Sequence, residues 1–394
     1  MTMLQLNHQP LLRGVNCTFL RYLYKQINWE ERLIGIAGQR GVGKTTFLLQ
    51  RVKKAFGESE KAWYLDLGNL WFLRNTLTET VASFCQAGGT HLFLDNVHLY
   101  PGWMAEVGRL WDAYSHLHIV FAVSSVQPVE NIRKELQRGV ACYFLQVLSF
   151  REFLAYESIL EMDPIPLDAL LANHYEWVKK VNKQINVVPV FKNYLEYGCY
   201  PFYWQDPDTF FSRLQQIIRI SILQDIPAVS SLPPTGADRI AKLLMAIAGA
   251  IPERLRPMEI LRQIGLVRTQ TDQYLSFLQG LGYVSLAPYE SSGPAARQHA
   301  FIGNTNVWIA LFGNKENRRA MAETFFVNQM SAVGKVRLLE NNDFLVNDTY
   351  TFRVGDPLRD YEKIKNKENS FAAIYGLPRS TYNRMPVWIL GFCY

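Results

Sequence analysis

Cysteine is scarce and scattered in this 394-residue sequence. The five cysteines lie far apart, at Cys17, Cys85, Cys142, Cys199 and Cys393, and no Cys-x-x-Cys or Cys/His spacing occurs. The sequence therefore indicates neither a zinc site nor a disulfide framework. Such sparse cysteine usage fits a reducing cytoplasm.

Long apolar runs and clustered charge are also missing. The most apolar stretch, at 243–251, is about half the ~20 residues that a membrane span needs. The first ten residues lack the basic and apolar regions of a secretory signal, so we expect a cytoplasmic protein with no membrane segment. The net charge is +6 with no long run of Lys or Arg, which is compatible with nucleic-acid binding but does not establish it.

What the sequence does have is material for packed cores. Hydrophobic residues make up 48% and charged residues 19%, which excludes a disordered chain, and no collagen-like, heptad or low-complexity pattern occurs. At roughly 150 residues per domain, the length predicts two or three domains.

A phosphate-binding loop is the first motif along the chain. The apolar run at 32–37 predicts a buried strand, GQRGVGKT follows at 38–45, and TFLLQRVKKAF predicts a helix. Glycines let backbone N–H groups face phosphate oxygens, and the helix N-terminus adds its positive end. Lys44 is expected to reach the β and γ phosphates, and Thr45 to hold Mg²⁺. The predicted nucleotide-binding residues are Gly38, Gln39, Arg40, Gly41, Val42, Gly43, Lys44, Thr45 and Thr46.

A second motif ends in a candidate metal ligand. Strands are predicted at 62–66 and at 91–95, and the latter, HLFLD, has the Walker B pattern of apolar residues ending in an aspartate. Asp95 is predicted to orient Mg²⁺ together with Thr45. The alternative is an ordinary buried strand that ends in an exposed aspartate.

The residues expected to carry hydrolysis depart from the usual pattern. A glutamate normally follows the Walker B aspartate and polarises the attacking water, whereas Asn96 stands here. An amide orients water but cannot accept its proton near neutral pH, so we expect slow or absent hydrolysis unless another carboxylate, such as Glu106, substitutes. Ser124, at the end of a strand predicted at 118–123, is a candidate sensor of the γ-phosphate or water. The alternative is a serine-rich turn.

A helix at 130–138 and a strand at 140–147 complete the pattern. Five strands alternating with helices predict an α/β domain with a parallel sheet and helices on both faces, as in P-loop NTPases of the AAA/ASCE type.

Several strings resemble one family: GQRGVGKTTFLLQ, LFLDNVHLYPGW, VFAVSS, LSFREFL, FKNYLEYGCYPFY, ETFFVNQM, DFLV and MPVWILGFCY. They resemble bacterial AAA-fold ATP-binding proteins that end in a restriction-endonuclease-like domain of unknown function, relatives of archaeal-type and STAND-like ATPases. The resemblance covers nearly the whole chain. It implies that Lys44 and Thr45 bind phosphate and Mg²⁺, and that Asp95 binds Mg²⁺.

The resemblance also bears on residues around these motifs. His98 belongs to the family's DE-x-H string, and Arg138 lies where the family has an arginine before the fifth strand, which makes it a candidate arginine finger. The alternative for Arg138 is a surface arginine. Asn96 replaces the family's glutamate and Ala122-Val123 its Thr-Gly, so the resemblance points to a degenerate ATPase.

Four domains are predicted: a P-loop core at 1–150, a helical region at 151–236 that the resemblance implies is the lid of the ATPase, a winged helix at 237–302 and, as the resemblance implies, a degenerate nuclease-like domain at 303–394. The winged helix is expected from helices at 238–250, 257–264 and 269–281 followed by a two-stranded wing. Its candidate nucleic-acid contacts are Arg262, Arg268 and Gln270. The alternative is a protein-packing module.

The last domain is predicted to be catalytically degenerate, with a helix at 317–330 and strands at 335–339, 343–346, 350–354 and 386–392. Restriction-endonuclease-like sites hold a divalent metal through several carboxylates. Glu323 and Asp343 fit two of those places, but Arg353 stands where a third carboxylate belongs. An active nuclease is therefore not expected.

Three functions remain open from the sequence. The first is a nucleotide-dependent switch that binds ATP or ADP with Mg²⁺, hydrolyses weakly or not at all, and acts on a DNA or protein partner, as a monomer or an oligomer. The second is an active ATPase with a different water-positioning group. The third is a non-enzymatic nucleic-acid-binding or scaffold protein.

Overall fold

The computed structural model describes residues 3–126, 129–137, 139–230, 232–251, 264–290, 298–313, 317–357, 361–365 and 367–394. The chain forms two compact units. The first contains Met1–Gln146 and Ile220–Pro233, and the second contains Val147–Arg219 and Pro234–Tyr394. The division into four domains, with boundaries at 150, 236 and 302, stays a prediction.

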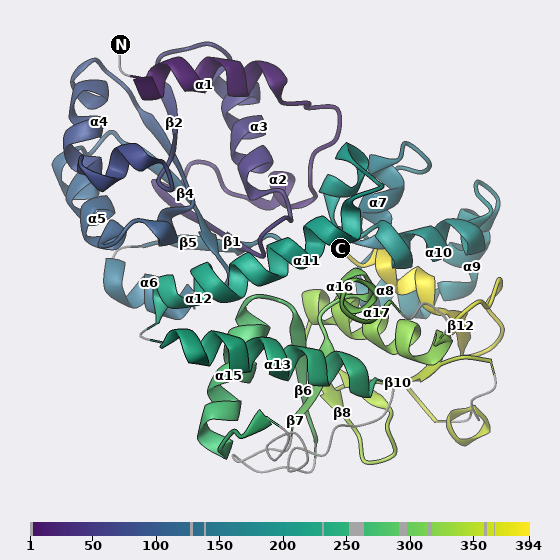
Figure 1. Ribbon diagram of the computed structural model, residues 1–394. Helices are drawn as coiled ribbons and strands as arrows, with labels where there is room; N and C mark the ends of the chain where they lie inside the picture. The colour runs from purple at the N-terminus through teal and green to yellow at the C-terminus, as the bar shows by residue number, and fades with distance from the viewer. Residues whose placement is uncertain are drawn as a thin grey trace. The chain divides into compact units, whose positions relative to one another are not determined.

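A five-stranded parallel sheet is the centre of the first unit (Figure 1). Its strands are β1 (Leu33–Gly38), β2 (Ala62–Asp66), β3 (His91–Asp95), β4 (His118–Ser124) and β5 (Ala141–Phe144). They lie in the order β2-β3-β4-β1-β5, so β4 separates the strand of the phosphate loop from the Walker B strand. The predicted α/β fold with a parallel sheet is confirmed.

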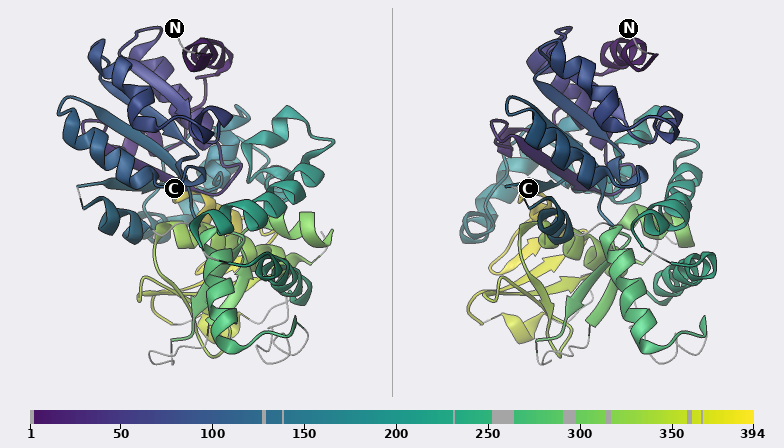
Figure 2. Two further views of the ribbon diagram at one scale, coloured as in Figure 1. Left: turned by 60° about the vertical axis from the view of Figure 1, so that its left-hand side comes forward. Right: turned by 90° about the vertical axis from the view of Figure 1, so that its left-hand side faces the viewer.

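Helices cover both faces of this sheet, which Figure 2 shows from two further sides. They are α1 (Met3–Gly14), α2 (Leu23–Gln26), α3 (Lys44–Phe56), α4 (Leu77–Gln86), α5 (Trp103–Ala113) and α6 (Val129–Leu136), with short 3-10 turns η1 (Leu70–Leu73) and η2 (Val97–Leu99). The chain comes back into the first unit at Ile220–Pro233, the returning segment, which adds the π-helical turn η4 (Ser221–Asp225) and α12 (Ile226–Val229).

The alternation of side chains in β3 shows why the strand is buried on both faces. Leu92 and Leu94 lie in one large apolar core together with Val81 of α4 and Leu110 of α5. Phe93 points to the other face, where its ring lies 6.1 Å from that of Phe56 in α3. Because successive side chains of a strand point to opposite faces of the sheet, the short apolar run of β3 packs against the helices on both faces.

Side chains of α3 form hydrogen bonds with the segment that follows α1. Gln50 donates hydrogen bonds to the carbonyls of Asn16 and Phe19, at 2.8 and 2.9 Å, and Lys53 donates to the carbonyl of Val15 at 2.7 Å. The chain before β1 is thereby fixed against the helix that begins at the phosphate loop.

The second unit begins with a helical region. Its helices are α7 (Phe150–Tyr156), α8 (Leu167–Ala172), α9 (His174–Asn182), α10 (Val187–Tyr197), η3 (Pro201–Gln205), α11 (Phe210–Ile220), α13 (Pro234–Ala250), α15 (Arg268–Gly280), α16 (Thr305–Phe312) and α17 (Arg318–Val333), with η5 (Glu362–Ile364) and η6 (Val387–Phe392) near the end.

Two of the strings that resemble the family meet within this unit. In LSFREFL, Ser149 accepts a hydrogen bond from the backbone of Glu152 and so caps α7. The Ser149 hydroxyl and the Arg151 Nε also donate to the backbone carbonyl of Tyr394, each at 2.9 Å. The string at 148–154 therefore anchors the last residue of the sequence.

Two sheets lie in the second unit. The larger has the order β12-β11-β10-β9-β8, and the smaller is an antiparallel pair. The strands are β6 (Val284–Pro288), β7 (Gln298–Ile302), β8 (Val336–Leu338), β9 (Phe344–Val346), β10 (Tyr350–Gly355), β11 (Ser370–Ile374) and β12 (Arg384–Pro386). Helix α17 packs on the larger sheet, with Phe326 against Phe344 and Phe352.

The predicted strand at 386–392 is wrong, because Val387–Phe392 is the 3-10 helix η6. All six of its residues are buried. An apolar run buried on every side shows no period of two or 3.6, so sequence cannot separate a strand from a helix there. The pattern also missed β11.

The winged helix stays a prediction. The structure describes α13, α15 and the β6–β7 hairpin, whereas the helix predicted at 257–264 lies almost wholly in 252–263, outside the described residues.

Candidate functional site

The phosphate loop connects β1 to α3 at the carboxyl edge of the first unit's sheet. A Cβ on Gly38 would lie 2.7 Å from the backbone oxygen of Leu145, so no larger residue fits there. Gly41 and Gly43 have φ of 90° and 96°, the left-handed region that glycine adopts without strain. Buried Arg21 donates to the carbonyl of Val42 at 2.8 Å and holds the loop from behind.

Lys44 lies inside the loop. Its Nζ donates to the carbonyls of Gly38 and Gln39, at 2.7 and 2.9 Å. Burial lowers the pKa of Lys44 to about 8, while the nearby carboxylates Asp95 and Asp225 oppose that shift. The ammonium is thus mainly charged at neutral pH.

Asp95 is the buried carboxylate of the same edge, 1% exposed. Its Oδ2 accepts from the hydroxyls of Thr45, at 2.5 Å, and Tyr64, at 2.9 Å, and its Oδ1 accepts from the backbone of Asn96. The structure thus places the two predicted metal ligands, Thr45 and Asp95, in direct contact. Tyr64 was not predicted, since nothing in the strand pattern distinguishes it from the aromatic residues of the core.

The side chain of Asn96 is bonded to a second aspartate, Asp66. The φ of Asn96 is 52°, and its Nδ2 donates to the carboxylate of Asp66 at 2.9 Å. Asp66 ends β2 opposite Asp95 in the register of the sheet and also accepts from the backbone of Gly68. A carboxylate therefore lies one hydrogen bond away from the position of the missing glutamate.

Glu106 does not serve this site. Its Oε1 accepts from the Tyr100 hydroxyl at 2.7 Å, and its Oε2 accepts from the backbone and hydroxyl of Thr78 at 2.8 and 3.0 Å. Burial alone would raise the pKa of Glu106, but these hydrogen bonds outweigh it and lower that pKa. The side chain fixes the start of α4 rather than acting as a base.

Ser124 and His98 meet at the end of β4. The backbone of Ser124, opposite Gly38 in the sheet register, donates to Nδ1 of buried His98 at 3.3 Å. Because Nδ1 accepts this bond, Nε2 carries the ring proton, and it lies 3.4 Å from Asp225 Oδ1 without the alignment of a hydrogen bond. Ser125 Oγ is buried and has no partner among the described residues. Its backbone N–H donates to the carbonyl of Gly38.

Asp225 is the residue that the motifs did not predict. It comes from the returning segment and forms an ion pair with Arg40 of the loop, at 2.6 and 3.3 Å. It also accepts from the Ser124 hydroxyl at 3.3 Å. Burial would raise the pKa of Asp225, but His98 and Arg40 outweigh it and lower that pKa to about 2. No sequence signal joins Asp225 to residues more than a hundred positions away.

The other predicted residues are only partly described. Gln39 and Val42 are buried in the loop, whereas Thr46 is exposed on α3. Arg138 and Arg262 lie outside the described residues, as does the side chain of Arg268. Gln270 is half-buried on α15. Nucleic-acid contact and the arginine finger stay predictions.

The two carboxylates that fit a nuclease-like site in the sequence, Asp343 and Glu323, are each paired with an arginine. Asp343, with no exposed surface, accepts from Arg353 at 2.7 and 2.8 Å and from Asn341 at 2.8 Å. Glu323 accepts from Arg319 at 2.9 Å. Among the described residues, no group of three or more His, Cys, Asp or Glu side chains could hold a metal.

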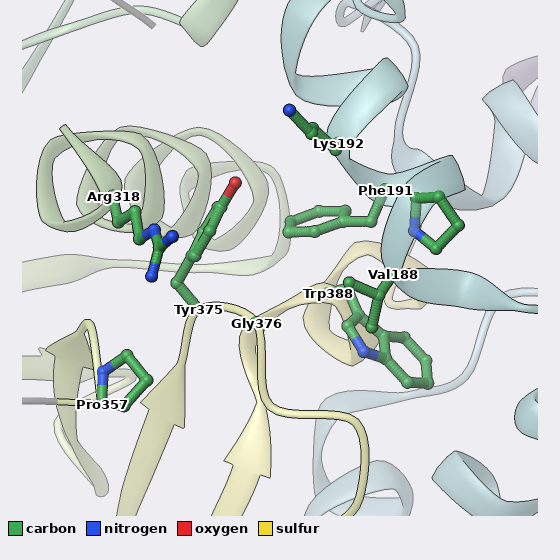
Figure 3. A pocket seen from close by; sticks show the side chains of 9 residues that line it. Val188, Phe191, Lys192, Arg318, Pro357, Tyr375, Gly376 and Trp388 are labelled. Carbon is green, nitrogen blue, oxygen red and sulfur yellow. The ribbon is translucent and has the colours of Figure 1, made fainter. Parts of the chain in front are cut away.

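A separate hollow of about 920 Å³ lies in the second unit (Figure 3). Figure 3 shows Lys192 on one helix, Arg318 on another, and Tyr375 and Trp388 among the residues that line it. None of its nine lining residues is a carboxylate, cysteine or histidine.

The residues at the loop fit a nucleotide with Mg²⁺. The Thr45 hydroxyl and Asp95 carboxylate are the oxygen ligands that Mg²⁺ prefers, and Lys44 supplies a positive charge within the loop. The buried Ser125 hydroxyl, which has no hydrogen-bond partner among the described residues, is a further donor just after β4.

Comparisons with known proteins gave a family match that covers the phosphate loop and the Walker B strand. The family model of an AAA domain matches residues 30–154. Among curated proteins, no sequence matches this chain. None of the helices described here has the length and apolar character of a membrane span.

Solved structures of three proteins are similar at low scores. A DNA replication initiation factor has TM-score 0.25 and 14% identity, covering 66% of this chain and 88% of its own. AMPPCP-bound DnaA from Aquifex aeolicus has TM-score 0.29 and 16% identity, with 72% and 97% covered. Katanin, from a structure titled for its self-assembly, has TM-score 0.25 and 14% identity, with 74% and 84% covered. Because all three TM-scores are below 0.5, the assignment rests on the strand order and the family model. The first unit carries an AAA-type P-loop NTPase domain.

Proposed function

We propose that the protein binds ATP with Mg²⁺ at the phosphate loop and retains it with slow hydrolysis, so that the bound nucleotide acts as a switch. The observation that carries the proposal is the contact between Thr45 and Asp95 beside a loop filled by the Lys44 ammonium. These groups supply the oxygen ligands and the positive charge that a magnesium triphosphate requires.

Slow hydrolysis follows from the surroundings of Asn96. Bound Mg²⁺ would neutralise charge on the phosphates, but the attacking water still needs a group that accepts its proton. Asn96 has no basic oxygen of that kind, and its Nδ2 is held by Asp66. Glu106 is occupied by Tyr100 and Thr78. The binding groups are therefore present, while the usual base is absent.

Binding is tested by calorimetric titration of Mg-ATP. We expect a micromolar dissociation constant for the wild type and about 100-fold weaker binding for Lys44→Ala, because that ammonium is a charge-assisted donor inside the loop. Lys54→Ala is the matched control, since Lys54 is an exposed lysine on the same helix. No binding of Mg-ATP to the wild type, or equal binding by Lys44→Ala, contradicts the proposal.

An active ATPase is the second candidate, favoured by the position of Asp66. Its carboxylate is bonded to Asn96 and ends the strand next to Asp95, so it could orient a water through the amide. Steady-state phosphate release that is fast in the wild type and lost in Asp66→Asn would support this candidate. DNA contact, a protein partner and assembly into oligomers stay predictions.

A further inference from the structure

Asp225 contacts three separate parts of the proposed nucleotide site. Its carboxylate pairs with Arg40 of the phosphate loop, accepts from the Ser124 hydroxyl at the end of β4, and lies 3.4 Å from His98 after β3. All of these groups belong to the first unit, as does Asp225. One buried carboxylate thus contacts the phosphate loop, the end of β4 beside it and the η2 turn that follows β3.

The returning segment, Ile220–Pro233, places the Asp225 carboxylate at the phosphate loop. Ser221, Ile222, Asp225 and Ile226 are buried, whereas Leu223 and Gln224 between them are exposed. The turn is π-helical, with the Ile226 N–H bonded to the Ser221 carbonyl. Such turns are rare and insert an extra residue into a helix, which here turns Asp225 toward the loop. Helix α12 then packs against η2, which carries His98.

The partners of Asp225 are groups that suit a phosphate. Arg40 offers a forked cation, and Ser124 offers a hydroxyl at the strand end where a sensor was predicted. Asp225 also acts on Lys44, since its charge raises the pKa of that ammonium. Because the carboxylate is 1% exposed and ionised, it places a negative charge where a triphosphate would bring more. Like charges in a buried site repel each other strongly.

We propose that Asp225 competes with the terminal phosphate of ATP for Arg40 and Ser124, so that ATP binding frees the returning segment from the phosphate loop. The inference rests on the proposed nucleotide binding and adds a residue that distinguishes ATP from ADP, since ADP lacks the phosphate in competition. Both ends of the segment continue into the second unit, so its release is a direct covalent route by which nucleotide state reaches the rest of the chain.

The affinity test compares wild type, Asp225→Asn and the control Asp208→Asn by calorimetry with Mg-ATP and Mg-ADP. Asp208 is an exposed aspartate before α11, so its substitution makes the same chemical change away from the site. We expect Asp225→Asn to bind Mg-ATP at least tenfold more tightly and Mg-ADP less than threefold more tightly, with Asp208→Asn unchanged for both. Unchanged or weaker Mg-ATP binding by Asp225→Asn overturns the competition.

Hydrogen exchange of the wild type gives a second readout that does not depend on how a variant folds. With Mg-AMPPCP bound, we expect the amides of Ser221–Val229 to exchange at least tenfold faster while those of the phosphate loop slow down. Lys44→Ala with the same analogue is the control and should show neither change. Slower or unchanged exchange of Ser221–Val229, with the loop protected, overturns the release of the segment but leaves nucleotide binding intact. If the loop is not protected either, the proposed function itself has failed.

Discussion

Two buried carboxylates, Asp95 in the first unit and Asp343 in the second, differ in the charge of the groups that donate hydrogen bonds to them. Asp95 accepts from two hydroxyls and a backbone amide, all of them neutral donors. Asp343 accepts from Nε and Nη2 of the Arg353 guanidinium and from the side-chain amide of Asn341. The hydrogen-bond donors to Asp95 carry no charge, although the Lys44 ammonium lies near enough to respond to its carboxylate, whereas Asp343 is bonded directly to a guanidinium.

This difference decides which aspartate can serve a cation. A carboxylate whose partners are neutral gains from a nearby Mg²⁺, while one already paired with a buried arginine would have to lose that partner first. Arg353, which stands where the sequence analysis expected a third carboxylate, forms two hydrogen bonds to Asp343.

Removal of the arginine should produce the largest effect. Arg353→Ala leaves the Asp343 carboxylate buried and without its cation, so we expect a loss of about 3–5 kcal/mol in the free energy of unfolding. Urea denaturation followed by circular dichroism measures it. The control is Arg384→Ala, because Arg384 pairs with the largely exposed Glu362 and should cost about 1 kcal/mol or less. Equal losses of unfolding free energy in the two variants would contradict the special role of the buried Arg353–Asp343 pair.

A smaller effect should distinguish the two aspartates by their response to magnesium. Asp95→Asn removes a charge that would act on the bound cation, so we expect about tenfold weaker ATP binding in Mg²⁺ and little change in EDTA. Calorimetry under both conditions measures this. Asp343→Asn, compared at a temperature where circular dichroism shows it folded, should change neither value. A loss for Asp95→Asn that is the same in EDTA would assign Asp95 a structural role.

The sequence predicted the parts of the site that are local in the chain. The phosphate loop and the Walker B strand are short patterns, and the parallel sheet follows from the alternation of strands and helices. The sheet then brings Gly38, Asp95 and Ser124 to one edge because the carboxyl ends of parallel strands meet there.

What the sequence could not supply depends on contacts between distant segments. Asp225 lies 185 positions from Arg40, and its role arises only when the returning segment packs on the loop. Glu106 illustrates the reverse case: a carboxylate near the motif in sequence is used by Tyr100 and Thr78 instead. The charge on a side chain can be known from sequence, whereas its partner depends on the fold.

Single-turnover hydrolysis tests the central claim, that the protein holds ATP without cleaving it quickly. With protein in excess over radiolabelled Mg-ATP, we predict that bound ATP stays largely intact in the wild type while Asn96→Glu cleaves it at least tenfold faster, since a positioned base contributes about 10²–10⁴-fold. Rapid cleavage by the wild type, unaffected by Asn96→Glu, would contradict the account.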